Sequence, residues 1–435
     1  MARGPLLVDN PVFHEGQVKL AKAFGTSLKP QGARNIARCG RRFGKTTMFE
    51  SAAADWSSNK LLVGWFAPDY KLLAPSYKRI LKMVKPIVES ANKVEGLIEL
   101  RGGGLIEFWT LNNEDAGRSR KYDKVVIDEA GLVKTKLKEI FEQAIAPTLL
   151  DRNGDAFMTG TPKGEDPESY FYEACTDKSL GWTDHHAPTW ANPTLSQEAL
   201  AKIEKNTPPL VYRQEFKAEF VNWNGVQFFE LAKMLEEDGN PCEMPDSVDG
   251  VYAVIDTAMK TGTDNDGTAV MFFAINKTFG HPLVVLDWDI VQIQGASLVT
   301  WLPWVYTRLE ELSRMTRARM GSVGVFIEDK SSGTILLQQA ENKGLPAHAI
   351  DSKLTEVGKD ERAVNVSGYV YRGCVKISRY AYEKVKEYKQ QSANHFLKQV
   401  LGFVLGDKDA AKRADDLLDT FTYGVAIGLG NDEGY

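Results

Sequence analysis

The sequence has few cysteines, no long hydrophobic run and no excess of basic residues. Its four cysteines, Cys39, Cys175, Cys242 and Cys374, lack C-x-x-C spacing. This pattern argues against a disulfide framework or a zinc site and favours reduced thiols. No segment approaches the roughly 20 apolar residues of a membrane span, and the N-terminus lacks the apolar core of a signal peptide. We therefore expect a soluble intracellular protein with no membrane partner.

The length and composition are those of a multidomain globular protein. The 435 residues suggest about two or three domains, and a hydrophobic content of 43% is enough to form cores. The formal net charge of −5 excludes a uniformly basic surface. The net charge does not exclude a local basic patch that binds nucleic acid, because such binding depends on where the charge lies.

Two parts of the chain alternate short apolar strand patterns with helical patterns. The first part covers residues 33–163, and the second begins near residue 251. Strands that alternate with helices favour an α/β fold with a mostly parallel sheet. The stretch 239–250 is rich in Gly, Pro and acids and predicts a linker, so we expect domains at 1–238 and 251–435.

The stretch ARCGRRFGKTT nearly matches the phosphate-binding pattern G-x-x-x-x-G-K-[ST]. Gly44, Lys45 and Thr46 are intact and Thr47 follows, whereas Cys39 takes the place of the first glycine. Backbone N–H groups, the Lys45 ammonium and the Thr46 hydroxyl would contact phosphate and Mg²⁺. A GKT match alone is common in turns, so the loop needs a partner motif.

That partner is KVVIDEA, which places Asp128 and Glu129 directly after an apolar strand. A strand-end aspartate can hold a Mg²⁺-bound water, and the adjacent glutamate can polarise an attacking water. A further strand ends in TGTP at 159–162. Two acids at one strand end are common, but in this order after the loop they predict ATP hydrolysis.

These motifs resemble the large terminase subunit of tailed bacteriophages, which packages DNA into a procapsid. The similarity spans nearly the whole chain and includes FHEGQ before the loop, IDEA, TGTPKG leading into YFYE, and YRQEFKAEF. An arginine-bearing loop that departs from the strict glycine pattern is typical of that family. The resemblance implies a P-loop ATPase domain with a mostly parallel sheet, followed by an RNase H-like α/β nuclease domain, with ATP and Mg²⁺ as cofactors.

The resemblance also implies roles for single residues of the first domain. Gln17 corresponds to an adenine contact, and Thr159 and Thr161 lie in the motif that couples hydrolysis to movement. Arg118 corresponds to an arginine that reaches a neighbouring subunit's ATP, although Ser119 replaces the glycine that often follows it.

Other arginines are candidates on chemical grounds. Arg41 and Arg42 lie inside the loop, where a guanidinium can bind phosphate oxygens. For Arg118 and Arg120, a solvated loop or a contact to DNA phosphate is an equal alternative to the trans-acting role. The expected nucleotide-site residues are Gln17, Arg41, Arg42, Gly44, Lys45, Thr46, Thr47 and Asp128, with Glu129 and Arg118 as catalytic groups.

The second domain carries acids at two strand ends and at the start of its last helical pattern. Asp256 ends YAVID, Glu328 follows VGVFI, and RADDLLDTF holds Asp415, Asp416 and Asp419. Positions three and four apart share a helical face, so these carboxylates could bind two metal ions about 4 Å apart. Any one of these acids alone could equally be an ordinary acidic residue at the end of a strand, with no role in metal binding. Together they resemble the terminase nuclease centre, with Asp256 and Glu328 as catalytic ligands beside either Asp415 or Asp416.

Several neighbouring polar residues receive simpler interpretations. Side chains alternate along a strand, so Asp329 should point away from the preceding glutamate. Asp264 and Asp266 are interpreted first as turn residues, and His185 and His186 as loop residues. The aromatic stretch WLPWVY fits a packed helix better than a base-stacking surface.

The resemblance implies a motor that couples ATP hydrolysis to translocation of double-stranded DNA and cuts the concatemer with an endonuclease that uses Mg²⁺ or Mn²⁺. Implied partners are double-stranded DNA, a small terminase subunit, a portal protein and further copies of the chain in a ring. Its place would be the host cytoplasm, transiently docked on the procapsid and absent from the mature virion. The alternatives are a helicase-like repair nuclease and a nucleotide-gated assembly protein that cuts nothing.

Overall fold

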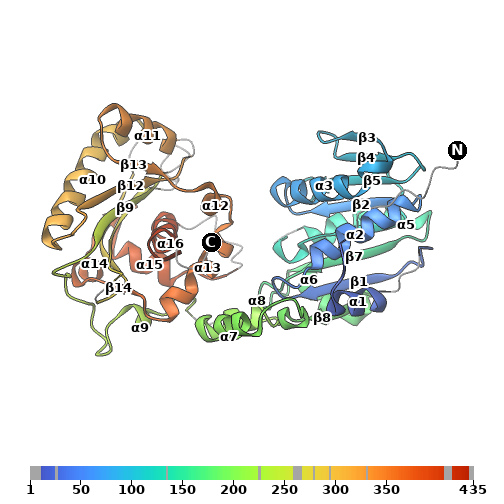
Figure 1. The fold of residues 1–435 in the computed structure, drawn as a ribbon, viewed down its shortest axis with the longest axis horizontal. Coiled ribbons are helices and arrows are strands. Elements are labelled where there is room, and N and C mark those ends of the chain that lie inside the picture. Colours follow the sequence, from blue (N-terminus) through green and yellow to red (C-terminus); the bar gives the residue numbers. More distant parts are fainter. Residues whose placement is uncertain are drawn as a thin grey trace. The chain divides into compact units, whose positions relative to one another are not determined.

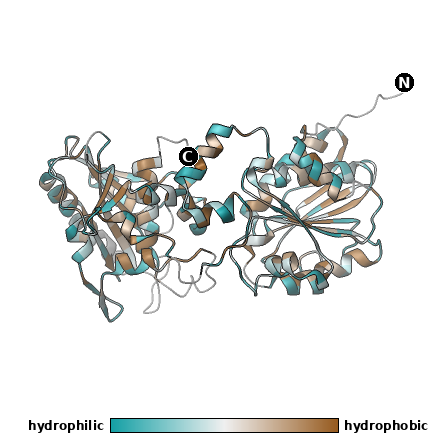
Figure 2. Cartoon of the chain, turned by 90° about the horizontal axis from the view of Figure 1, so that it is seen from below, coloured by the Kyte–Doolittle hydropathy of each residue, from teal (hydrophilic) through white to brown (hydrophobic). Residues whose placement is uncertain are grey.

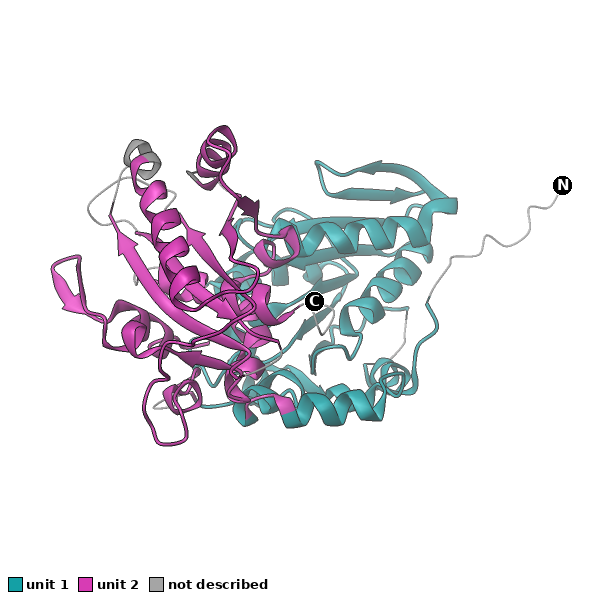
Figure 3. Ribbon diagram, turned by 60° about the vertical axis from the view of Figure 1, so that its left-hand side comes forward, with its two compact units in different colours: residues 1–205, 209–222 teal, residues 206–208, 223–435 magenta. Residues whose placement is uncertain are grey.

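The computed structural model describes residues 11–24, 28–133, 136–223, 227–257, 267–277, 280–292, 295–329, 332–405 and 414–430. The chain forms two compact units, drawn in teal and magenta in Figure 3. Unit 1 comprises Met1–Lys205 and Pro209–Asn222, and unit 2 comprises Asn206–Pro208 and Trp223–Tyr435. No described helix combines the length and apolar character needed to cross a membrane.

Unit 1 is built on an eight-stranded sheet in the order β3-β4-β5-β2-β6-β7-β1-β8 (Figure 1). The strands from β5 to β8 in that order are parallel, and β4 and β3 add antiparallel at one edge. Its strands are β1 Arg34–Cys39, β2 Leu62–Ala67, β3 Val88–Asn92, β4 Leu97–Leu100, β5 Leu105–Thr110, β6 Lys124–Ile127, β7 Asp155–Gly160 and β8 Thr183–Ala187. Its helices are α1 Glu15–Ala23, α2 Lys45–Ser58, α3 Tyr70–Val84, α4 Leu137–Ile140, α5 Ala146–Leu150, α6 Tyr170–Thr176, α7 Gln197–Asn206 and α8 Pro209–Glu215.

Successive side chains of these strands fill two cores, one on each face of the sheet. Ala37 and Trp65 pack with residues of α1, α2 and α3, whereas the adjacent Ile36 and Phe66 pack with residues of α4, α5 and α6. Strands buried on both faces need apolar side chains at every position, and Figure 2 shows the hydrophobic colour along them. The predicted α/β fold with a mostly parallel sheet is confirmed.

Unit 2 contains a six-stranded mixed sheet in the order β13-β12-β9-β10-β11-β14. β9 pairs antiparallel with β10 and parallel with β12. Its strands are β9 Gly250–Asp256, β10 Thr268–Ile275, β11 Leu283–Val291, β12 Ser322–Ile327, β13 Ala347–Ala349 and β14 Val375–Ile377, with a separate hairpin of β15 Lys386–Tyr388 and β16 Gln391–Ala393. Its helices are α9 Leu231–Met234, α10 Gly295–Met315, α11 Ser332–Asn342, α12 Ser352–Thr355, α13 Lys359–Tyr371, α14 Arg379–Glu383, α15 His395–Leu401 and α16 Asp416–Leu429.

The strands of this sheet also divide their side chains between two faces. Ala253 and Ile255 of β9 pack with α10, whereas Tyr252 donates to the Gly424 carbonyl of α16, at 2.7 Å. Because side chains alternate along a strand, Asp256 belongs to the same face as Tyr252. The strand pattern therefore directs the Asp256 carboxylate toward α16, the helix that carries the aspartates.

The stretch 239–250 differs from the linker that its Gly, Pro and acid content predicts. Cys242 and Val248 are buried in the core of unit 2, and Cys242 forms a β-bridge with Ser378. The two units divide between 205 and 223 instead. The two apolar side chains, Cys242 and Val248, pack this otherwise polar stretch against the core of unit 2.

Two other interpretations meet the structure differently. The WLPWVY stretch lies within α10, as predicted. Asp264 and Asp266 lie outside the described residues.

We predict that Gly424→Ala destabilises unit 2 by about 1–3 kcal/mol, the usual cost of overpacking. A Cβ at Gly424 would lie 2.1 Å from two atoms of the Phe273 ring. Phe273→Leu removes that ring edge, so the double variant should lose less stability than the sum of the two single variants. Urea unfolding of the four proteins measures this coupling, and strictly additive losses would contradict the packing account.

Candidate functional sites

The first candidate site joins the loop after β1 to the acids after β6. Lys45 and Thr46 begin α2, and Asp128 and Glu129 follow β6. The Lys45 Nζ lies 2.8 Å from Glu129 Oε1, and the Thr46 hydroxyl lies 3.3 Å from Asp128 Oδ1, to which it donates. β1 and β6 are separated in the sheet only by β7, so their carboxyl ends meet at one edge. The two motifs that the sequence singles out are brought together.

The shape of the loop explains the displaced glycine. Cys39 is the last residue of β1 and fully buried, so the loop begins one residue later, at Gly40. A Cβ at Gly40 would lie 2.5 Å from both the Phe216 carbonyl oxygen and the Thr189 hydroxyl. Only glycine fits there, which accounts for the near-match to the phosphate-loop pattern.

Side chains from three segments hold the loop backbone. Cys39 O accepts from the Thr161 hydroxyl at 3.0 Å, and Arg42 O accepts from Asn192 Nδ2 at 2.8 Å. Gln17 donates its amide to Gly44 O at 2.9 Å. Thr161 and Gln17 therefore contact the loop itself, which connects the TGTP and FHEGQ motifs to the site.

The two loop arginines have different surroundings. Arg41 pairs with the fully buried Glu215 at 2.6 Å, and Lys163 Nζ lies 2.9 Å from the other oxygen of the same carboxylate. Burial alone would raise the pKa of Glu215, but Lys163 and Arg41 outweigh it and lower the pKa to about 2. Arg42 is exposed and has a left-handed backbone, with φ of 62°. Arg41 thus anchors the loop, and Arg42 faces solvent beside it, as does the exposed Thr47.

The acids of this site carry more negative charge than the protein neutralises. Burial raises the pKa of Asp128 to about 7, with the Glu129 charge adding to the rise and Lys45 opposing it. Burial lowers the pKa of Lys45, but the Glu129 and Asp128 charges outweigh it and leave that pKa raised. Asp128 and the Thr46 hydroxyl are oxygen ligands of the type that Mg²⁺ prefers, so they fit this cation.

The backbone at Glu129 is unusual. Its φ of 50° and ψ of 40° lie in the left-handed region, which costs a residue other than glycine of order 1 kcal/mol or more. Strain of this kind persists where the surroundings impose it, and it gathers at active sites. Thr159, at the end of the neighbouring β7, has a buried hydroxyl with no partner among the described residues.

The two arginines before β6, Arg118 and Arg120, have different partners. Arg118 is 56% exposed and pairs only with the exposed Asp115 among the ion pairs of the described residues. Arg120 pairs with Glu107 at 3.0 Å, and its guanidinium lies over the Trp109 ring. Ser119 has φ of 66°, the conformation that favours the glycine often found there. The two side chains are similarly exposed, at 56% and 50%, so they differ in their partners and not in their exposure.

The second candidate site lies at the carboxyl ends of β9 and β12. Their parallel register pairs Ile255 with Ile327, so the following residues, Asp256 and Glu328, lie side by side. Asp329 is exposed and accepts from the Thr334 hydroxyl at 2.7 Å, whereas Glu328 is half-buried. β12 ends at Ile327, so the strand alternation expected for this pair of acids stays a prediction.

Helix α16 brings a third acid to this pair. Asp416 is buried and its Oδ2 accepts from the Gly267 N–H at 3.1 Å. Burial raises the pKa of Asp256 well above its ordinary value, and the charges of Asp419, Asp416 and Glu328 raise it further. Within the described part of the chain, no group of three or more His, Cys, Asp or Glu residues is arranged to hold a metal ion. The carboxylates supply oxygen ligands of the kind that divalent cations prefer.

Helix α13 supplies two cations that the sequence did not reveal. Arg362 pairs with Asp419, and its guanidinium lies 4.0 Å from the centre of the Tyr423 ring. The Tyr423 hydroxyl in turn donates to Glu328 at 3.2 Å. Lys359 pairs with Asp415 and, at 3.2 Å, with Asp419. No motif marks these residues, because their role depends on how α13 packs on α16.

The two adjacent aspartates of α16 are thereby distinguished. Asp415 pairs with Lys359. The charges with the largest effect on the pKa of Asp256 are those of Asp419, Asp416 and Glu328. Of the two sequence candidates, Asp416 is the one favoured as a neighbour of Asp256.

The expectation of a loop at His185 and His186 is wrong, because both lie in β8. His185 Nε2 lies 3.0 Å from Asn35 Oδ1, and His186 Nε2 lies 2.6 Å from the Lys217 carbonyl. β8 is the edge strand beside β1 and is only partly buried, so its polar sequence hid its strand character.

Comparison with known proteins gives one consistent answer. No family model matches the chain. The large terminase subunits of Thermus virus P23-45 and Thermus phage G20c are each 25% identical over 250 residues, which is 46% of this chain. That match covers 49% of either relative, so it spans about half the length of those proteins.

Among solved structures, a large terminase from a thermophilic bacteriophage has a TM-score of 0.61 and 14% identity, and it covers 96% of this chain and 99% of its own. A further crystal form of it, in complex with ATP-gamma-S, has a TM-score of 0.60. The chain therefore has the two-unit α/β fold of a large terminase. By sequence it is similar to the large terminase subunits of these Thermus viruses over about half of their length.

We predict that Glu215→Gln lowers the free energy of unfolding of unit 1 by about 3 kcal/mol at pH 7, because it leaves Arg41 and Lys163 without their buried partner. The folded pKa of Glu215 lies below its ordinary value, so its stabilisation is present above about pH 4.5 and is lost as pH falls toward about 2. Glu219→Gln is the control, since it removes an exposed ion pair and should cost under about 1 kcal/mol. Equal losses for both variants at pH 7 would contradict this account.

Proposed function

We propose that this chain is a viral DNA-packaging motor. It couples ATP hydrolysis to translocation of double-stranded DNA into a procapsid, and it cuts the DNA concatemer with a metal-dependent endonuclease. One observation carries the proposal: a single chain with the large-terminase fold has two acidic sites. One lies at the carboxyl end of β6 with a phosphate loop beside it, and the other lies at the carboxyl ends of the neighbouring strands β9 and β12 without such a loop.

In the first site, the phosphate loop would bind ATP through its backbone N–H groups and Lys45. Thr46 and Asp128 would hold Mg²⁺, which neutralises phosphate charge when bound. The Lys45–Glu129 ion pair, 2.8 Å long, holds both side chains together before ATP arrives. When Lys45 turns to the phosphates, Glu129 is released to orient and deprotonate the attacking water.

Gln17 and the arginines would complete the nucleotide site. The Gln17 amide nitrogen carries two hydrogens and uses one on Gly44 O, which leaves a donor for adenine. The exposed Arg118 would act on the ATP of a neighbouring subunit in a ring. Thr161, bonded to Cys39 O, and the buried Thr159 would transmit the state of the loop to β7.

In the second site, Asp256, Glu328 and Asp416 would hold divalent cations, Mg²⁺ or Mn²⁺. Such a pair of cations activates water and stabilises the leaving oxygen of a phosphodiester. Asp256, at the end of β9, would be a ligand of the cations together with these two acids. Arg362, through Asp419 and Tyr423, keeps the neighbouring side chains in place.

The proposed partners follow from this activity: double-stranded DNA, a small terminase subunit, a portal protein and further copies of the chain in a ring. The protein would act in the host cytoplasm, transiently docked on a procapsid and absent from the mature virion. A helicase-like repair nuclease is less favoured, because the described residues hold one ATPase core rather than two. The acidic cluster disfavours a pure assembly protein, since it brings repulsion without benefit to a scaffold.

We predict that Glu129→Gln slows ATP hydrolysis at least about a hundredfold, the usual scale for removal of a positioned base. Nucleotide binding should stay near the parental level, because Lys45, Thr46 and Asp128 are unchanged. Phosphate release and binding of a fluorescent ATP analogue measure the two properties separately. A hydrolysis rate close to the parent's would remove Glu129 from this role.

We predict that Asp256→Asn and Glu328→Gln each reduce plasmid cleavage in Mg²⁺ and Mn²⁺ to background and leave ATP hydrolysis near normal. Asp329→Asn is the matched control, because its carboxylate is exposed and accepts from the Thr334 hydroxyl. It should keep most of the cleavage. A thermal melt shows whether each variant is folded, and a folded Asp256→Asn protein that cuts at the parental rate would overturn the metal assignment.

A further inference from the structure

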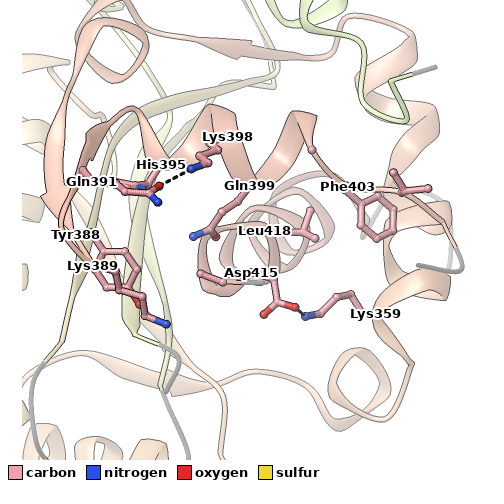
Figure 4. A pocket seen from close by; sticks show the side chains of 13 residues that line it. Lys359, Tyr388, Lys389, Gln391, His395, Lys398, Gln399, Phe403, Asp415 and Leu418 are labelled. Carbon is pink, nitrogen blue, oxygen red and sulfur yellow. Dashed lines mark hydrogen bonds and ion pairs between the residues drawn. The ribbon is translucent and has the colours of Figure 1, made fainter. Parts of the chain in front are cut away.

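A pocket of about 530 Å³ lies in unit 2 beside the acidic cluster. The hairpin β15–β16, helix α15 and the start of α16 form its walls (Figure 4). Asp415 lines it and directly precedes Asp416 in the chain, which places the pocket at the N-terminal end of α16. The pocket is too small for a duplex and large enough for one nucleotide.

The charge of its lining is opposite to that of the chain. Lys359, Lys389 and Lys398 line the pocket, and Asp415 is the one acid among the described lining residues. The whole chain has a net charge of −5, so three lysines around one cavity are a local concentration. Lys359 is paired with Asp415, and Lys398 donates to Gln391 Oε1 at 2.6 Å. Lys389 and Lys398 are exposed on the hairpin and on α15, and the Lys389 ammonium lies 5.6 Å from the centre of the Tyr388 ring. Phosphate is the ligand group that such lysines bind best in nucleic acids.

The hairpin presents Lys389 at a cost in backbone strain. Lys389 has φ of 47° and Gln390 has φ of 60°, so both residues of the turn are left-handed. Two-residue hairpin turns of this kind strongly favour Asn-Gly or Asp-Gly. A lysine and a glutamine are poor choices for the turn itself. Strained positions of this sort gather where a side chain is needed for binding.

The remaining walls fit a nucleobase. Tyr388 and Phe403 line the pocket with small aromatic surfaces, since they are only 6% and 8% exposed, and Leu418 adds an aliphatic surface. Gln399 Oε1 accepts from the Leu417 N–H at 2.7 Å, and its amide nitrogen points into the pocket on the side of Tyr388 and Lys389 (Figure 4). Bases stack on aromatic rings without regard to sequence, and an amide adds a donor for a base edge.

We propose that this pocket binds one unpaired nucleotide of a DNA strand, with its phosphate at Lys389 and Lys398 and its base against Tyr388 and Phe403. The bound nucleotide fixes the strand next to Asp256 and Asp416, so that a neighbouring phosphodiester lies at the cutting site. This inference rests on the proposed nuclease function. It adds to it a strand-holding site that requires local opening of the duplex.

The test uses the full chain and the double variant Lys389→Ala, Lys398→Ala. Binding of a fluorescein-labelled oligothymidylate is followed by anisotropy without divalent metal, so that nothing is cut. The variant should bind at least about tenfold more weakly, and the slope of log affinity against log salt should shrink by about 0.7 for each lost phosphate contact. Lys343→Ala removes an exposed lysine elsewhere in unit 2 and is the matched control.

Cleavage kinetics give a second readout. The double variant should need more DNA for half-maximal plasmid cleavage while its rate at saturating DNA stays near the parent's, and its ATPase rate and melting temperature should not change. Unchanged oligonucleotide affinity, or equal losses in the Lys343→Ala control, would overturn the pocket. Inorganic phosphate that competes as well as thymidine monophosphate would show a simple anion site and overturn the base contact. If the parent cuts no DNA, the nuclease proposal fails, and the binding arm still decides whether the pocket holds a nucleotide.

Discussion

The structure depends on the electrostatics of carboxylates placed at the ends of buried strands. Such an acid is costly unless a positive charge opposes it, and both units supply one from the protein itself. Lys45 lies against Glu129 in unit 1, and Arg362 lies against Asp419 in unit 2. Burial, with the charges of neighbouring acids, nevertheless keeps the pKa values of Asp128 and Asp256 raised. A divalent cation would favour the charged form of each carboxylate.

The scaffold positions these acids through simple strand geometry. In unit 2, the register of β9 and β12 puts Asp256 beside Glu328, and alternation along β9 turns Asp256 toward α16. Gly424 then lets α16 approach the sheet, because any side chain there would meet the Phe273 ring. Close helix packing brings Asp416 within electrostatic reach of Asp256. The absence of a side chain at Gly424 thus affects the position of Asp416, about two helical turns away.

The sequence predicted the parts of the sites that depend on order along the chain. The loop before Lys45, the strand before Asp128 and the strand before Asp256 are local patterns, and the structure places them as strand ends. The contributions of Arg362 and Lys359 could not be predicted from the sequence, because they come from the packing of α13 on α16 and follow no spacing rule. The sequence also could not show which of Asp415 and Asp416 lies nearer to Asp256, because the two residues are adjacent in the chain. The linker at 239–250 was misjudged for a similar reason, since its composition says nothing about the core that Cys242 enters.

The central claim is that the acids of unit 2 form a cation site that is separate from the ATPase site. The most direct measurement is anomalous diffraction at the manganese edge from crystals of the full chain soaked in Mn²⁺. The account predicts two anomalous peaks about 4 Å apart among Asp256, Glu328 and Asp416. Well-ordered density for these three side chains without any anomalous peak between them would contradict it.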